Sequence, residues 1–368
     1  MTGNLEELRA IIALKMCDGI GDISAYKLIS FCGSAQEVFK EKSKHLSTIP
    51  GISASIAGLI HTGIDWKKVD KEVNFIEQNH ISYVSIFDPA YPKNLLVTDS
   101  PPVLLFFTGT IEKLNHAPCV SIVGTRNATH YGTEAVAEII SSLRNTDVCV
   151  ISGLAHGIDI ITHKYCLQNH VPTFGVVGHG LKTIYPSTHR SYAQQMAESG
   201  GGIITEFFSD EIPNRENFPK TNRIIAGLSF ATLVIEASQK SGTLITARYA
   251  LDYKRQLFVL PGRYNDKNSE GCNFLIRTTA AKPILSIGSL CEELRFKKKP
   301  AAPLPKIFLE LTLEEQNIMS ILHQKSKSYI DHISSVSQLH VSTCSSILFN
   351  LEMKGLIRSL PGKVYELC

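Results

Sequence analysis

The residues of this chain that are best suited to chemistry gather in one short stretch, from Phe218 to Ala247. Its basic and amide side chains open a predicted helix, where free backbone N–H groups already favour an anion: Lys220, Asn222 and Arg223. A buried strand predicted at 231–235 then leads through a turn with Gly242 and Thr243 into a second helix start. Because such turns lie along one edge of a parallel sheet, both helix starts are expected to face one crevice. We interpret this crevice as a site for a nucleic-acid backbone.

A second turn of this kind follows a strand predicted at 120–123. Gly124 lets the backbone approach an anion closely, Thr125 supplies a hydroxyl group, and Arg126 can bind a phosphate through two donors. The turn lacks the Gly-x-Gly-x-x-Gly pattern of nicotinamide and flavin sites, and it is not a P-loop. A phosphate contact without a nucleotide cofactor is therefore predicted.

Two further strands are predicted to end in polar turns at the same edge. Ser152 and Gly153 are candidates for backbone contacts with an anion. Asp159 and His163 stand one helical turn apart, and either Asp159 caps and orients this turn or the two residues pair within the helix. Lys182 lies in the next loop, where a phosphate contact and a simply solvated lysine are both open.

An aromatic residue stands beside these cations. Arg215 and Phe218 are three residues apart, and a cation next to an exposed aromatic ring suits single-stranded nucleic acid, in which a base stacks while its phosphate is neutralised. The alternative is that Phe218 is buried as a hydrophobic staple before the helix. The adjacent basic cluster favours the binding role.

The carboxylates at this edge do not make a convincing catalytic centre. Glu206 and Glu236 both follow predicted strands, as a pair of hydrolytic carboxylates would. However, no His or Cys stands at a spacing that suits a nucleophile or base, and no Asp/Glu cluster indicates a metal. We expect Glu236 to hold its turn by accepting backbone N–H bonds. No catalytic residue, metal or cofactor is predicted.

The elements that must position these turns alternate regularly. Short apolar strands are predicted at 120–123, 148–151, 173–177, 203–205, 232–235, 257–260 and 284–286. Helices are predicted between most of them, at 132–143, 158–168, 189–198, 222–228, 244–253 and 272–279. This pattern indicates an α/β fold with an extended Rossmann-like, doubly wound, mostly parallel sheet. Runs at 82–87 and 103–107 are expected to add strands to it.

The segments on either side of this region lack its alternation of strands and helices. Residues 5–61 are expected to be helical, and Gly-Ile pairs before two helices suggest either a helix-hairpin-helix or sterile-alpha-motif-like module or a plain bundle. The C-terminal segment, with three helices and a Pro-Gly hairpin, is expected to be winged-helix-like. Its third helix is nearly uncharged, which leaves duplex binding and protein contact both open. The predicted domains are 1–75, 76–292, a basic proline-rich linker at 293–306, and 307–368.

Length, composition and net charge indicate the broad class of protein. The chain has 368 residues, a 43% apolar content and a net charge of +3, which permits an anionic partner without requiring one. No apolar run approaches the roughly 20 residues that span a bilayer, and no signal peptide is apparent. Nine scattered cysteines are expected to be reduced thiols. A cytoplasmic location without a membrane partner is predicted.

Several of these segments resemble a known family. They are Gly124-Thr-Arg, Ser152-Gly-Leu-Ala-x-Gly-Ile-Asp, Tyr185-Pro, Phe218-Pro-x-x-Asn-Arg-Ile-Ile-Ala-Gly-Leu-Ser and Glu236-Ala-x-x-x-Ser-Gly-Thr-Leu-Ile-Thr-Ala. Together they resemble the DNA-processing protein A (DprA/Smf) family from about residue 81 to 287. The family departs from this chain where it commonly has Arg in place of Thr221 and Asn in place of His189. The missing cation is expected to weaken DNA binding unless Arg215 and Lys220 offset it.

The resemblance implies a bacterial cytosolic protein that is not an enzyme. It implies a homodimer that binds single-stranded DNA, protects incoming strands during natural transformation and loads the RecA recombinase onto them. It assigns Gly124, Thr125 and Arg126 to a phosphate-binding turn. It places Arg215, Phe218, Lys220 and Arg223 on the strand-binding motif.

Two other functions stay open on the sequence. A nucleotide-processing enzyme of the lysine-decarboxylase-like phosphoribohydrolase type shares the Rossmann-type layout, but its Pro-Gly-Gly-x-Gly-Thr-x-x-Glu signature is present only as fragments in the wrong order. A duplex-binding regulator would act through the winged helix. Release of base from nucleoside monophosphates, lost on replacing Glu236, would identify the first. The second requires that removal of the segment after Pro303 abolishes DNA binding, whereas we expect that it does not and that Arg126→Ala does far more damage.

Overall fold

The computed structural model describes residues 4–296, 312–324, 327–353, 356–360 and 362–367. The chain forms two compact units, Met1–Pro300 and Ala301–Cys368. Most of the predicted linker, from residue 297 on, lies outside the described residues, as does Pro361 of the predicted hairpin turn. Among the described residues, none of the helices is both long and apolar enough to cross a membrane.

The first unit begins with helices only, as predicted. Side chains of Asn4, Ser34, Ser53 and Asp65 cap four of them by accepting backbone N–H bonds. Gly19 and Gly51 take the left-handed backbone at the two Gly-Ile turns, with φ of +81° and +92°. The helices are α1 (Leu5–Met16), α2 (Asp22–Cys32), α3 (Ala35–Lys40), α4 (Ser43–Leu46), α5 (Ala54–Thr62) and α6 (Trp66–Gln78).

A nine-stranded sheet follows, in the order β1-β2-β6-β5-β4-β3-β7-β8-β9. The pairs from β6 to β9 are parallel, while β1 and β2 add an antiparallel edge, which confirms the two extra strands that were expected. The strands are β1 (Ser82–Ser85), β2 (Leu104–Gly109), β3 (Cys119–Val123), β4 (Cys149–Ser152), β5 (Thr173–Val176), β6 (Gly202–Thr205), β7 (Ala231–Val234), β8 (Gln256–Val259) and β9 (Lys282–Pro283). Only β9 differs clearly from its prediction at 284–286, because the pairing with β8 ends before Ser286.

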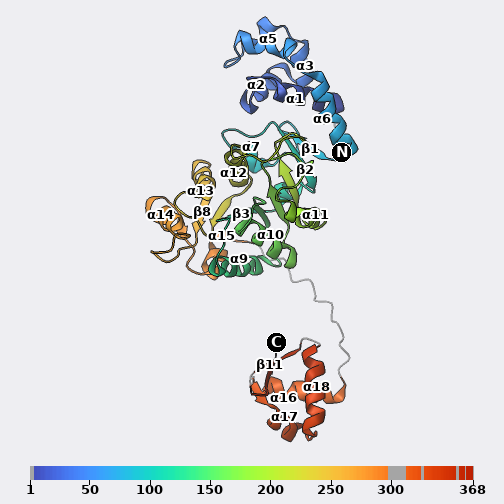
Figure 1. Ribbon diagram of the computed structural model, residues 1–368, viewed down its shortest axis with the longest axis vertical. Helices are drawn as coiled ribbons and strands as arrows, with labels where there is room; N and C mark the ends of the chain where they lie inside the picture. Colours follow the sequence, from blue (N-terminus) through green and yellow to red (C-terminus); the bar gives the residue numbers. More distant parts are fainter. Residues whose placement is uncertain (1–3, 297–311, 325–326, 354–355, 361, 368) are drawn as a thin grey trace. The chain divides into compact units, whose positions relative to one another are not determined.

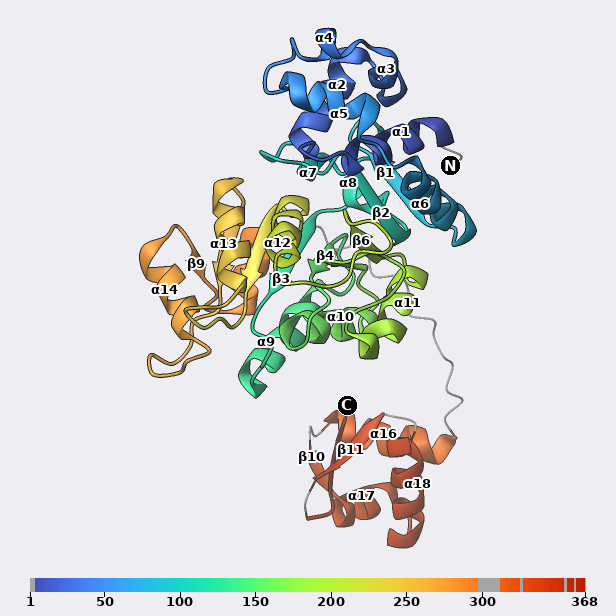
Figure 2. The same ribbon diagram turned by 45° about the horizontal axis from the view of Figure 1, so that its top comes forward.

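Helices cover both faces of this sheet, and alternate strand residues supply the two cores. Val120 and Ile122 of β3 pack in one apolar cluster with α9 and α15, whereas Ser121 points to the other face and donates to Ile225 of α12. On that second face α12 packs beside α13 (Figure 2). The helices are α7 (Lys93–Leu96), α8 (Lys113–His116), α9 (His130–Leu143), α10 (Ile158–Gln168), α11 (Arg190–Glu198), α12 (Asn217–Leu228), α13 (Thr243–Asp252), α14 (Glu270–Thr278) and α15 (Ile287–Leu294).

The strand order reverses beside β3. The chain steps from β3 through β4 and β5 to β6, and then returns by way of α12 to place β7 on the other side of β3. Ligands of open α/β sheets bind outside the carboxyl ends of the strands at such a reversal. The predicted doubly wound fold is confirmed, and the reversal places the turn after β3 beside the segment that leads into α12.

The second unit is a small helical domain with a three-stranded sheet of order β10-β12-β11 (Figure 1). Its three helices precede the β11–β12 hairpin, as expected for a winged helix, and the short strand β10 adds to the sheet. The elements are α16 (Leu313–Gln324), β10 (Lys327–Tyr329), α17 (Ile330–Ser337), α18 (Val341–Met353), β11 (Ile357–Leu360) and β12 (Val364–Leu367).

Candidate nucleic-acid interface

The turn after β3 is held in place by Glu236, which follows β7. The backbone carbonyl of Glu236 accepts the N–H of Thr125 at 2.7 Å. Its carboxylate accepts the N–H of Thr129 at 2.9 Å and the Thr129 hydroxyl at 2.5 Å. Glu236 is 1% exposed, so these bonds are shielded from water. The expectation that Glu236 fixes the turn is confirmed, and the result is a rigid base for Arg126.

Glycines let two loops touch at this turn. A Cβ atom at Gly157 would lie 2.2 Å from the carbonyl oxygen of Thr125, and Gly157 has a left-handed φ of +77°. A Cβ atom at Gly124 would lie 2.5 Å from Ile158. The start of α10 therefore packs directly on the backbone of the Gly124–Arg126 turn. Gly124 serves this close packing in addition to any approach by an anion.

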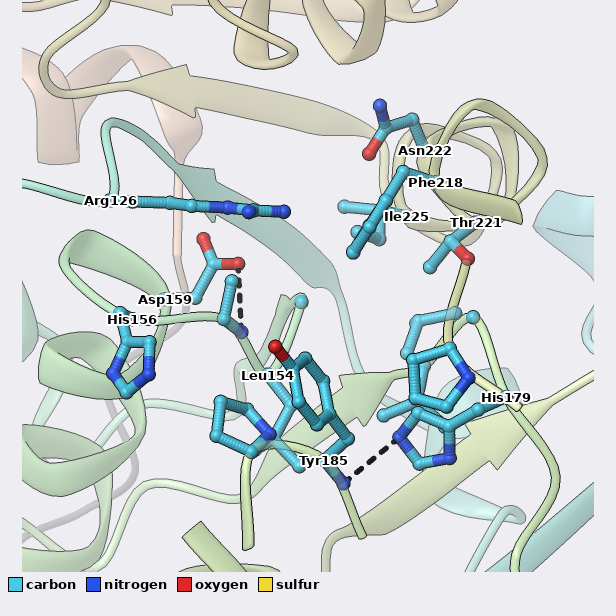
Figure 3. Close-up of a pocket in the computed structure, with 17 residues that line it drawn as sticks. Arg126, Leu154, His156, Asp159, His179, Tyr185, Phe218, Thr221, Asn222 and Ile225 are labelled. Carbon is cyan, nitrogen blue, oxygen red and sulfur yellow. Dashed lines mark hydrogen bonds between the residues drawn. The ribbon is translucent and has the colours of Figure 1, made fainter. Parts of the chain in front are cut away.

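Arg126 meets Phe218 at the mouth of a pocket. The guanidinium carbon of Arg126 lies 4.8 Å from the centre of the Phe218 ring, within the range of a cation–π contact. Figure 3 shows the two side chains reaching toward each other, from the turn after β3 and from α12. Two residues that were predicted separately, 92 positions apart, thus come together.

The position of Phe218 differs from the prediction in one respect. Helix α12 begins at Asn217 rather than at 222, so Phe218 lies in its first turn and not ahead of it. Pro219 is compatible with this, because the first residues of a helix do not need their N–H groups for intrahelical bonds. Phe218 is partly exposed and contacts Arg126, so it is not buried as a hydrophobic staple before the helix.

The pocket below this pair has a volume of about 90 Å³, well under the several hundred Å³ of typical small-molecule sites. Its walls combine apolar residues with a few polar groups from the turns after β3, β4 and β5 and from α12. The lining includes Arg126, Gly153, Leu154, His156, Asp159, His179, Tyr185, Pro186, Pro213, Phe218, Thr221, Asn222 and Ile225. Five of them were missed, although the two histidines stand in turns after predicted strands: Leu154, His156, His179, Pro213 and Ile225.

Asp159 is the acidic group of the pocket. Its carboxylate accepts the N–H of Ala155 at 3.4 Å and lies beneath Arg126 (Figure 3). Burial raises the pKa of Asp159 to about 7, against the opposing effects of its hydrogen bonds and of the Arg126 charge. The net charge of the pocket therefore changes close to neutral pH.

The suggested pair between Asp159 and His163 is not formed. Both ring nitrogens of His163 have other partners, the Thr173 hydroxyl at 2.8 Å and the Gly153 carbonyl at 2.6 Å. Burial lowers the pKa of His163 to about 4, so the ring is neutral at physiological pH. His163 is a structural residue that links α10 to β5 and to the turn after β4.

Arg223 is a correction to the predicted site. Its side chain is only 11% exposed, with Nη2 2.5 Å from Glu206 and 3.3 Å from Asp22, and Nη1 donating to the carbonyl of Ser100 at 2.8 Å. An arginine held by two carboxylates within the protein is not free to bind a phosphate. The sequence could not show this, because its partners are far away along the chain.

Ser152 is a second correction. It is fully buried, and its hydroxyl donates to the carbonyl of Ile122 at 2.6 Å, so it braces β4 against β3. Gly153 does line the pocket. A Cβ atom there would lie 2.5 Å from the Asp159 carboxylate, so the glycine leaves room for that side chain. Thr243 is buried at the start of α13, while Gly242 accepts a bond from Asn222 at 3.3 Å.

The remaining predicted cations are exposed, and none of these three residues lines the pocket. Lys220 lies 5.9 Å above the Phe207 ring, and Arg215 stands in the loop that leads into α12. Lys182 donates to Asp210 at 2.6 Å, an exposed pair of small energetic value that an anion can break. Thr221, where a cation was expected from the resemblance, is 4% exposed and donates to the carbonyl of Asn217.

Comparison with known proteins gives matches over both units. Residues 82–295 match the family model described as DNA recombination-mediator protein A, and residues 298–363 match the DprA winged helix domain. Protein Smf of Synechocystis sp. is 31% identical over 394 residues, covering 96% of this chain and 97% of that protein. DNA processing protein DprA of Streptococcus pneumoniae is 37% identical over 212 residues, covering 58% of this chain and 74% of that protein.

Two solved structures share the fold at similar identity. DNA processing protein A of Streptococcus pneumoniae has a TM-score of 0.67 at 29% identity, covering 81% of this chain and 99% of that one. DNA processing protein A of Helicobacter pylori has a TM-score of 0.53 at 30% identity, covering 59% of this chain and 97% of that one. The Helicobacter pylori structure concerns that protein's single-stranded DNA binding mode.

Proposed function

Because this chain belongs to the DNA recombination-mediator protein A (DprA/Smf) family, we propose that it binds single-stranded DNA at the pocket between Arg126 and Phe218. In this proposal it protects incoming strands during natural transformation and loads the RecA recombinase onto them. The related protein of Helicobacter pylori, whose structure concerns single-stranded DNA binding, supports the choice of ligand.

The observation that carries the proposal is the contact between Arg126 and Phe218. A nucleotide offers a flat base and an anionic phosphate, and this pair offers a flat ring and a planar cation 4.8 Å apart. A base that stacks on the same face of Phe218 displaces the guanidinium, which then stands free to pair with a phosphate. Bases within a duplex are already stacked on their neighbours, so this exchange favours a single strand.

The charges around the pocket support an extended polyanion. Arg126, Arg215 and Lys220 are all exposed, and the N-termini of α9, α10 and α13 lie at the same edge of the sheet. The pocket itself is too small to enclose a whole nucleotide. A single DNA strand that runs across the opening of the pocket and inserts part of one nucleotide fits this volume better than a fully enclosed mononucleotide.

The carboxylates near the pocket support a binding role over catalysis. Both oxygens of Glu236 are held by Thr129, and Glu206 is paired with Arg223. Neither of them is among the described residues that line the pocket. Asp159 does line it, but its carboxylate accepts the N–H of Ala155 and lies beneath Arg126. We therefore propose that the protein is not an enzyme and needs no cofactor.

The remaining parts of the proposal follow the family. We propose a homodimer in the cytoplasm with RecA as partner, and domains at 1–75, 76–292 and 307–368 joined by a linker at 293–306. Loading is tested directly by whether the protein speeds RecA filament formation on single strands. A protein that binds single strands but leaves RecA filament formation unchanged would refute this part alone.

Binding is tested by a salt titration with a single strand and with a duplex of the same sequence. We expect the single strand to bind more tightly, and Arg126→Ala to weaken it strongly. Arg144→Ala is the matched control, since Arg144 is an exposed arginine at the opposite end of α9. Equal binding of both DNA forms, or equal effects of the two substitutions, would contradict the proposed site. Tighter duplex binding would instead support the winged helix as the DNA-binding part.

A further inference from the structure

Two carboxylates of the N-terminal helices, the buried Glu72 and the partly buried Asp22, contact the segment 206–223. The carboxylate of Asp22 in α2 accepts a hydrogen bond from the Arg223 guanidinium in α12. The carboxylate of Glu72 in α6 accepts one from the N–H of Ser209, in the loop before α12. Between these two anchored positions lie the exposed Arg215 and Lys220 and the partly exposed Phe218. The segment that carries the proposed strand contacts is therefore held near both of its ends by the helices α2 and α6.

The anchor at Glu72 is made entirely of hydrogen bonds. One carboxylate oxygen accepts the N–H of Ser209 at 2.9 Å, and the other accepts the Ser209 hydroxyl at 2.6 Å. Glu72 is only 5% exposed, and its burial raises its pKa. The neighbouring Lys71 adds an exposed ion pair with Asp210, which also pairs with Lys182. The start of the segment is thus fixed to α6 at two consecutive residues.

The anchor at Asp22 is a cluster of four charges. Asp22 accepts Lys15 at 2.6 Å and the N–H of Val103 at 3.0 Å with one oxygen, and Arg223 at 3.3 Å with the other. Arg223 in turn lies 2.5 Å from Glu206. The second oxygen of Glu206 is buried without a hydrogen-bond partner among the described residues, so Glu206 depends on Arg223 for its compensation. Removing one member of such a buried cluster leaves an uncompensated charge and favours rearrangement.

These contacts add to the packing that fixes the position of α12. Helix α12 must hold Phe218 within reach of Arg126, which is fixed on the far side of the pocket by the Glu236 turn. A shift of α12 along its axis would separate the ring from the guanidinium. Arg223 lies five residues after Phe218 on the same helix, so the bond to Asp22 opposes such a shift directly.

We infer that Asp22 and Glu72 are positioning residues for single-stranded DNA binding, and that the N-terminal helices brace the strand-binding segment. This inference rests on the proposed function. It assigns these helices a role that needs no direct contact with DNA. This role holds whether they form a DNA-binding helix-hairpin-helix module or a plain helical bundle.

The test uses Asp22→Asn and Glu72→Gln in the full chain, since both keep the size of the side chain. Simple electrostatics predicts that removing a negative charge tightens DNA binding. Positioning predicts the opposite sign, a weakening of about 2- to 30-fold, the range that substitutions away from a ligand typically produce. Asp70→Asn is the control, because it removes one carboxylate of the same helices from an exposed pair with Arg9.

Two further readouts separate positioning from a general loss of stability. Quenching of a fluorescent base analogue in the strand reports stacking, and it should fall in both variants at temperatures well below their Tm. Asp22→Glu, which keeps the carboxylate, should recover part of the affinity. If Asp22→Asn does not fold, Glu72→Gln carries the same test.

The result that overturns the inference is DNA binding at least as tight as the parent's in the folded variants, while Phe218→Leu still weakens it. If Phe218→Leu and Arg126→Ala also leave binding unchanged, the proposed site itself fails. The two failures are therefore distinguishable.

Discussion

Replacing Phe218 by leucine tests the proposed site most directly. Stacking of one base on an aromatic side chain contributes about 1–3 kcal/mol. The contact with Arg126 that the base must displace is worth about 0.5–1 kcal/mol at an exposed position such as this one. The middle of each range leaves a difference of about 1.25 kcal/mol, which corresponds to a Kd for single-stranded DNA that is about 8-fold weaker in Phe218→Leu.

The assay is fluorescence anisotropy with a short single strand at several salt concentrations. Leucine removes the ring and leaves the phosphate contacts, so the affinity should fall while the slope of log K against log salt stays the same. Phe218→Tyr keeps a ring and should bind nearly as the parent does. An unchanged Kd in Phe218→Leu, or an equal loss in Phe218→Tyr, would show that no base stacks on this ring.

Four other predictions concern the surroundings of this contact. Arg126→Gln should lower the magnitude of the salt slope by about 0.7, the value for one phosphate of a single strand, whereas Arg144→Gln should leave it unchanged. Between pH 8 and 6 single-stranded DNA should bind more tightly, because the raised pKa of Asp159, about 7, makes this carboxyl neutral as the pH falls; Asp159→Asn should flatten the pH profile. By the same raised pKa, Asp159 stabilises the fold below its ordinary pKa and loses this contribution as the pH rises toward 7, so Asp159→Asn should remove that part of the pH dependence of unfolding. Glu236→Gln should lower the free energy of unfolding by about 1.5–3 kcal/mol, the value of hydrogen bonds to a charged group, and a Tm equal to the parent's would contradict the bracing of the Arg126 turn.

The sheet was predictable because its strands are short apolar runs separated by helical patterns, and periodicity of this kind is local. The residues Arg126 and Phe218 were predicted for the same reason, each from its own turn. Their contact was not predictable, since it depends on the return of the chain from β6 to β7.

The wrong assignments share a different cause. Arg223 has the side chain that an anion site needs, and Ser152 stands in a turn whose backbone N–H groups were expected to meet an anion. Their partners decide otherwise: Asp22 is 201 residues away from Arg223, and Ile122 is 30 residues away from Ser152. Burial and long-range pairing of a polar group are properties of the packed chain, and no local pattern reports them.

The reversal of strand order beside β3 also constrains how the protein is made. β3 ends at Val123, but its neighbour β7 begins only at Ala231. During synthesis one edge of β3 therefore has no partner strand until more than a hundred further residues have been made. Long-range parallel pairing of this kind is slow and leaves apolar strand edges exposed to other chains. Glu236, which holds the turn that carries Arg126, directly follows β7, so this turn is braced only after that closure. Nascent chains that stop before β7 should thus be prone to aggregate, and they lack the Glu236 bonds that hold the Arg126 turn.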